Sequence, residues 1–209
     1  NRGIKDSNRK IIATELAKFL GVDEAVPETF EGIPLLNNLK SWYFPFEVNR
    51  ATDHIDSLWD VFAAAIAYSD TDDDLAREEF AKAFDSANGR RGVAWNLTFG
   101  LYWIRPWTFL SLDHNSKVYV SKKLGVPIGL HGPKRRCNSA DYLAVMDVLE
   151  PRFQEASYPA HSYPELSLEA WLYKDPTDEK TSAGEKDVGD ADDGDDEADA
   201  AAQEDVHVA

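Results

Sequence analysis

The chain has 209 residues, of which 43% are hydrophobic and six are tryptophan, enough for the core of one large domain or two small ones. Its net charge of −16 is uneven, because three Lys and 14 Asp or Glu from Lys174 onward give −11 and leave −5 for residues 1–173. The single cysteine, Cys137, excludes an intramolecular disulfide and is typical of a cytoplasmic protein. The apolar run 93–104 is shorter than the roughly 20 residues of a bilayer span, so no membrane helix is expected.

Composition divides the chain into two parts. Residues 174–209 carry almost no large apolar side chain and repel one another by charge, so they predict an acidic disordered linker or tail. Residues 1–173 predict the folded region. Because the sequence begins without Met and directly in a helical pattern, we expect this region to be truncated at its N-terminus.

The first predicted element is a helix over residues 7–20, which Gly21 ends. It is followed by a loop, and then by the aromatic, proline-interrupted stretch 39–48, which predicts a short strand or an irregular core segment. The apolar side chains on one side of the helix are Ile11, Ile12, Leu16, Phe19 and Leu20.

Two further helices are predicted in the middle of the chain. Residues 53–66 show the clearest amphipathic period, with Thr52 as a candidate cap. Thr71 with Asp74 resembles a capping box that opens the next helix, which runs to Gly89.

The run 93–104 fits two patterns, because its apolar residues alternate as in a strand and also fill one face of a helix. We favour the helix, since the neighbouring segments offer no strand partners. Asp113 then supplies a cap for a segment that ends at Gly125.

Two helices are predicted near the end of the folded region. The first begins at Ser139, and Pro151 interrupts it or begins a new turn. The second covers residues 166–172. The sequence therefore predicts a mainly α, compact helical domain with possible short strands, followed by the acidic tail.

Several segments resemble the region that precedes the AAA+ motor in McrB-like restriction proteins, the motor and specificity subunits of modification-dependent (5-methylcytosine-specific type) restriction systems. The similarity covers residues 1–172. It is most specific at Asn1-Arg2-Gly3-Ile4, at Leu36-Asn37-Asn38 and at Gly100-Leu101-Tyr102-Trp103-Ile104-Arg105-Pro106. The resemblance implies a restriction or defence role, an AAA family ATPase motor beyond the acidic tail and a nuclease subunit as partner. It transfers no catalytic residue.

The chain itself lacks a nucleotide-binding loop. The nearest string lies at 129–136, where Pro133 occupies the position of the phosphate-binding Lys and Arg135 follows Lys134 in place of Ser or Thr. We therefore expect no enzyme activity and no cofactor in this chain.

Basic residues of the second half are candidates for phosphate contacts with duplex DNA, although solvated charges are the alternative. Exposure of Trp107 or Tyr119 beside them would favour nucleic acid, because stacking needs an accessible ring. The candidate DNA-binding residues are Arg105, Trp107, Lys117, Lys122, Lys123, Lys134, Arg135 and Arg136.

Asp113 has a second interpretation, because the segment around it loosely resembles the catalytic-Asp segment of helix-hairpin-helix DNA glycosylases. The match needs a one-residue insertion and lacks the preceding hairpin motif, so a capping Asp113 is favoured. The five His residues lack metal-ligand spacing, and the acidic cluster at 70–74 lacks the pattern of an EF-hand, so no metal site is predicted.

The leading hypothesis is a cytoplasmic, non-catalytic DNA-recognition or adaptor region of a McrB-like protein. The alternatives are a glycosylase-like nucleobase-processing enzyme that uses Asp113, and a pure protein-interaction module. A basic groove with exposed rings would indicate DNA recognition, and an open pocket around Asp113 would indicate the enzyme.

Overall fold

The computed structural model describes residues 5–34, 42–71 and 73–174, and within them the regular elements are helices without a β-strand. The mainly α prediction is confirmed. The predicted acidic tail beyond residue 174 lies outside the described residues, as do the segments 1–4 and 36–38 of the McrB-like resemblance. No helix among the described residues is long and apolar enough to span a membrane.

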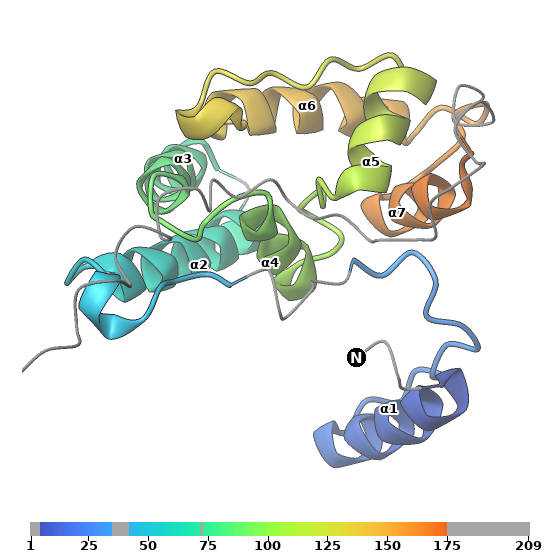
Figure 1. Cartoon of the computed structure of the whole chain (residues 1–209). Helices are drawn as coiled ribbons and strands as arrows, with labels where there is room; N and C mark the ends of the chain where they lie inside the picture. The colour runs from blue at the N-terminus through green and yellow to red at the C-terminus, as the bar shows by residue number, and fades with distance from the viewer. Residues whose placement is uncertain (1–4, 35–41, 72, 175–209) are drawn as a thin grey trace, which may run out of the picture.

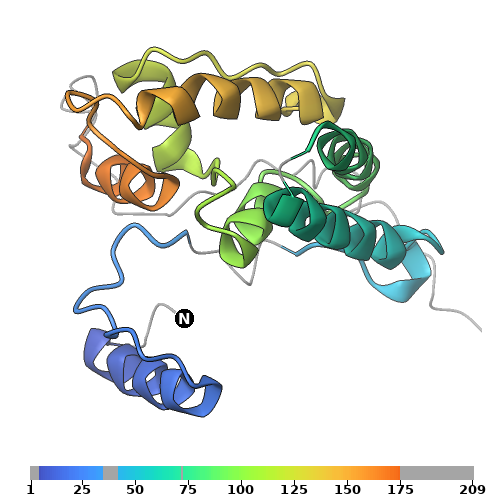
Figure 2. The same cartoon turned by 180° about the vertical axis from the view of Figure 1, so that it is seen from behind.

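Helix α1, Asp6–Leu20, stands apart from the other helices at the end of an extended segment (Figures 1 and 2). Its predicted end is confirmed, because Gly21 has a φ of 69°, a left-handed conformation that glycine adopts without strain. No residue of α1 is buried, so the predicted apolar face is open to solvent.

Helices α2, His54–Thr71, and α3, Asp74–Asn88, pack against each other. The predicted Thr71–Asp74 capping box is wrong, because α2 runs on to Thr71, whose hydroxyl donates to the Ala67 carbonyl at 2.9 Å. The cap of α3 is Asp73, whose carboxylate accepts from the Ala76 amide at 2.7 Å. An Asp in extended conformation directly before the first turn satisfies this amide better than a residue still bound within α2.

An aromatic cluster joins α3 to its neighbours. Phe80 is fully buried; it stacks on Tyr68 of α2 with ring centroids 5.6 Å apart and lies 5.1 Å from the ring of Phe109. Phe84 stacks at 5.2 Å on Tyr142 of α6, Ser139–Arg152. This part of the core therefore lies between α2, α3 and α6, with α3 in the middle (Figure 1).

Helix α4, Asn96–Ile104, settles the ambiguous apolar run in favour of the predicted helix. Six of its nine residues are buried, and a helix with most of its surface in the core needs little polar surface. This explains why the apolar pattern fitted both a strand and a helix. The described part of the stretch 39–48 is irregular and leads into a 3-10 turn at Glu47–Asn49, so the strand alternative fails for residues 42–48.

The remaining elements form the other side of the domain. Helix α5, His114–Val118, continues into a π-turn at Tyr119–Lys123 and packs against α7, Tyr163–Leu172. Helix α6 begins at Ser139 as predicted, with Asn138 and Asp141 forming a capping box, and Pro151 lies in its last turn. Helix α7 begins three residues before the predicted start, because Ser162 caps it.

Candidate binding site

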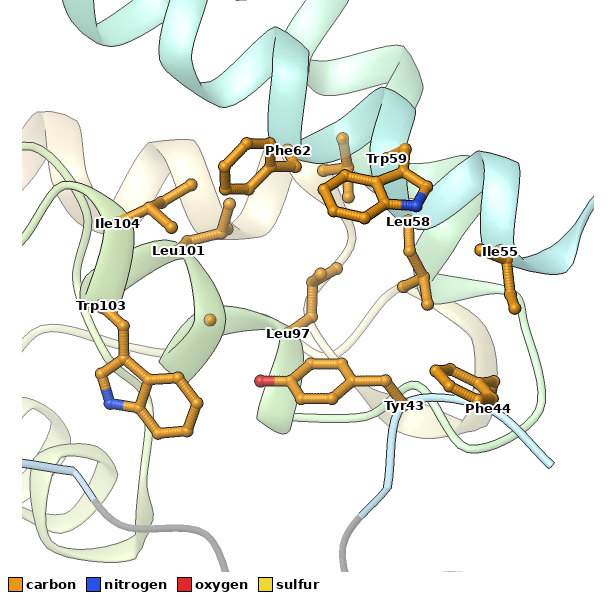
Figure 3. A pocket seen from close by; sticks show the side chains of 12 residues that line it. Tyr43, Phe44, Ile55, Leu58, Trp59, Phe62, Leu97, Leu101, Trp103 and Ile104 are labelled. Carbon is orange, nitrogen blue, oxygen red and sulfur yellow. The ribbon is translucent and has the colours of Figure 1, made fainter.

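An apolar pocket of about 550 Å³ opens between α2, α4 and the segment before α2 (Figure 3). Its lining includes no Asp, Glu, His, Lys, Arg, Cys or Ser. The lining residues are Tyr43, Phe44, Ile55, Leu58, Trp59, Val61, Phe62, Leu97, Gly100, Leu101, Trp103 and Ile104. Such a surface offers contact area for an apolar ligand, and its one ionisable side chain is that of Tyr43.

Helical periodicity builds two of its walls. Ile55, Leu58 and Phe62 follow the i, i+3, i+7 spacing on α2, and Leu97, Leu101 and Ile104 follow i, i+4, i+7 on α4. The two helices contact each other, so their apolar stripes face a common space. The pocket is the part of this space that the two stripes leave unfilled.

Tyr43 forms the third wall. Its hydroxyl donates to the Asn96 carbonyl at 2.9 Å, and the His54 imidazole bonds to the Tyr43 carbonyl at 3.2 Å. Burial raises the pKa of Tyr43 to about 12, so its hydroxyl stays protonated and serves as a donor. Gly100 permits this approach, because a Cβ there would lie 3.0 Å from the tyrosine oxygen.

The rim of the pocket is aromatic and accessible. Trp59 is 62% exposed and meets Phe62 edge-on at 5.7 Å, and Trp103 is 46% exposed. The Trp103 indole donates to the Pro34 carbonyl at 3.0 Å, which fixes its orientation. Large rings held at the edge of an apolar cavity are typical of protein-binding surfaces.

The predicted DNA-contacting residues include three that are engaged within the fold. Arg136 is 8% exposed, and its guanidinium donates to the Val93 carbonyl. Arg105 donates to the Ile104 carbonyl at 3.0 Å and pairs with Asp70 at 3.4 Å. The Lys117 ammonium lies 4.3 Å from the centroid of the Trp95 ring.

The other basic candidates are exposed but divided between two places. Lys134 and Arg135 lie in the 3-10 turn that precedes α6, whereas Lys122 and Lys123 follow α5. The loop between these groups runs along α6, so they lie toward opposite ends of that helix (Figures 1 and 2). These four side chains therefore do not form one cluster, and their contact with DNA stays a prediction.

The two aromatic indicators give opposite results. Trp107 is 75% exposed, which a stacking platform needs, whereas Tyr119 is 2% exposed and packs in the core. Exposure of Trp107 alone therefore does not define a nucleic-acid site.

Asp113 caps α5, as the favoured interpretation predicts. Its carboxylate accepts from the Ser116 amide at 2.8 Å, and the backbone at Asp113 is extended, with φ −69° and ψ 175°. The apolar pocket does not include Asp113 among its lining residues. The geometry thus assigns this carboxylate a structural role.

Replacing Asp113 by alanine is expected to lower the free energy of unfolding by about 1 kcal/mol, because the Ser116 amide loses its acceptor. Asp113→Ser should restore most of the loss, since a hydroxyl also caps a helix start. Denaturant unfolding of both variants measures this. A stable Asp113→Ala variant would contradict the capping role.

The remaining predicted features have structural roles where the structure describes them. Within the described residues, no three His, Cys, Asp or Glu side chains gather as a metal site would require. Asp73 caps α3 and Asp74 lies in its first turn, in agreement with the predicted charged helix start, whereas Asp70 lies in the last turn of α2 and pairs with Arg105. Cys137 is 2% exposed, and burial raises the pKa of its thiol to about 12, so it is not poised as a nucleophile.

The pocket is the feature that sequence reasoning missed. Its signal was present in two apolar stripes, at residues 55–62 of the predicted amphipathic helix and at residues 97–104 of the ambiguous apolar run. An apolar stripe in the sequence does not show whether side chains from other elements fill the space beside it. Here Trp59 and Trp103 stay partly exposed at the rim, and the space between the two stripes remains open.

One protein family, described as a domain of unknown function (DUF8425), matches residues 1–173. No curated protein and no solved structure matches the chain. The matched range contains every helix from α1 to α7 and thus the whole pocket. Since the match extends over most of the sequence, the chain belongs to the DUF8425 family.

Proposed function

We propose that this chain is a non-catalytic adaptor module that binds an amphipathic helix of a partner protein in the pocket between α2 and α4. The observation that carries the proposal is the apolar lining of that pocket with its exposed tryptophan rim. An apolar groove between two helices accepts the apolar face of a third helix through side chains at i, i+4 and i+7.

The charge next to the pocket specifies the partner further. Asp56 and Asp60 are exposed on α2 beside Trp59, and α2 carries three Asp and no Lys or Arg. A partner helix with basic residues flanking its apolar face would complement this edge. The proposal keeps the adaptor role of the leading sequence-based hypothesis.

The proposal is tested by selecting ligands from a library of displayed helical peptides against the full chain. We expect enriched peptides to carry apolar residues at i, i+4 and i+7 with basic flanks, and Trp59→Glu to weaken their binding by about 30-fold or more, as for an interface hot spot. Leu75→Glu is the matched control, because Leu75 is an exposed apolar residue on α3 outside the pocket.

Two outcomes would contradict the proposal. The first is enriched peptides that bind Trp59→Glu and the native chain equally well. The second is tight binding of duplex DNA that falls steeply with salt and disappears in Lys134→Ala/Arg135→Ala, which would indicate recognition through phosphates.

A further inference from the structure

Helix α1 has the features that the pocket requires of its ligand. Ile12, Leu16 and Phe19 follow the i, i+4, i+7 spacing, and Ile11 and Leu20 extend the same face. All five side chains are exposed, Phe19 to 83%. Among the described residues nothing buries this apolar face, and exposed apolar surface of this kind is typical of an interaction element.

The charges of α1 and α2 are complementary. Residues 5–20 contain four basic and two acidic side chains, a net charge of +2, against −3 for α2 from its three Asp. Arg9 lies on α1 next to the apolar face by helical spacing, and Asp56 and Asp60 lie next to Trp59 on α2. Seating α1 in the pocket would bring opposite charges to the edge of the contact.

In the structure α1 lies outside the pocket of its own chain, and two contacts accompany this position. Lys10 on α1 pairs with Glu28, and the Ser167 hydroxyl of α7 donates to the Gly32 carbonyl. Gly32 is fixed there, because its φ is 75° and a Cβ would lie 2.7 Å from Leu168 Cα. The four steps from Glu28 to Gly32 span at most about 14 Å, so α1 lies on the α7 side as long as Lys10 pairs with Glu28 (Figure 1).

We propose that the pocket takes α1 from a second copy of this chain, which forms a two-fold dimer in which each α1 lies on the partner's α2–α4 pocket. This inference rests on the proposed helix-binding function and names its occupant. A second copy supplies α1 without breaking the Lys10–Glu28 or Ser167–Gly32 contacts. The exchange is reciprocal, so one rotation satisfies both apolar faces and closes the assembly.

Sedimentation equilibrium of the full chain tests the dimer. At roughly 100 μM, where any dimer with a micromolar Kd is populated, the native chain should be dimeric. Leu16→Glu should be monomeric, and it cannot act through misfolding of the core because α1 buries no residue. Thr14→Glu is its control, since Thr14 lies on the opposite side of α1 and should leave the dimer intact.

The pocket side is tested in the same way. Trp59→Glu should be monomeric, whereas Leu75→Glu should remain dimeric. Mixing Leu16→Glu with Trp59→Glu should restore association, because one chain then contributes an intact pocket and the other an intact α1. This rescue is specific to contact between α1 of one chain and the pocket of another.

The results separate the two proposals. A native chain that stays monomeric, or a dimer that neither Leu16→Glu nor Trp59→Glu weakens, would overturn the α1 exchange. If library helices still bound the pocket in a Trp59-dependent way, helix binding would stand and only the identity of its occupant would be wrong. If neither α1 nor any library helix bound there, both proposals would fail.

Discussion

Phe80→Ala is expected to lower the free energy of unfolding by about 3–5 kcal/mol, because it removes the ring at the centre of the aromatic cluster. Phe80 is fully buried, and its ring contacts Tyr68, Phe84 and Phe109, so alanine would leave a cavity between α2 and α3. Because domains of this kind are stable by only about 5–15 kcal/mol, the loss is a large fraction of the total. Urea unfolding followed by far-UV circular dichroism measures it.

Two control variants show whether the loss comes from the cavity that Phe80→Ala creates. Phe80→Leu keeps most of the volume and should cost less than about 2 kcal/mol. Leu75→Ala removes an exposed side chain from the same helix and should change stability by no more than about 0.5 kcal/mol. Equal losses for Phe80→Ala and Leu75→Ala would show that the aromatic cluster is not the centre of the core.

Arg136→Ala should lower the free energy of unfolding by about 2–3 kcal/mol, because the buried Val93 carbonyl loses a charged donor. This effect distinguishes a structural arginine from a DNA-binding one. The neighbouring Arg135 is exposed, so Arg135→Ala should change stability by at most about 0.5 kcal/mol.

Thermal unfolding of the two arginine variants, together with a salt series of DNA binding, measures both properties. Arg136→Ala should unfold at a temperature lower by roughly 4–12 °C, given about 2–4 °C per kcal/mol for a chain of this size. An Arg136→Ala variant with native stability but weakened DNA binding would restore Arg136 to the phosphate-contacting set.

Most helices could be predicted from residue patterns alone. The period of residues 53–66 predicted α2, and glycine correctly ended α1 at Gly21. Boundaries were predicted less well, since Thr71 and Asp73 both suit a helix start and only the length of α2 decides which of them acts as the cap. Capping depends on where the preceding helix stops, and local sequence leaves that open.

Side-chain roles depended more strongly on the tertiary structure. Arg135 and Arg136 are adjacent and chemically identical. Arg135 is exposed, whereas Arg136 is buried and donates a hydrogen bond to the Val93 carbonyl. The role of Asp113 could be predicted from sequence alone. A helix cap accepts from an amide only three residues away, so its geometry depends on neighbouring residues of the chain.

The sequence by itself determined that the chain is mainly helical, where its apolar faces lie, and that Asp113 caps a helix, because these properties arise from contacts within one or two turns. Only the tertiary structure decided which apolar faces meet. The face of α3 is closed by α2 and α6, the stripes of α2 and α4 leave a pocket, and the face of α1 meets solvent. Burial depends on contacts between residues distant in the chain, and a periodic pattern records only that a face is apolar.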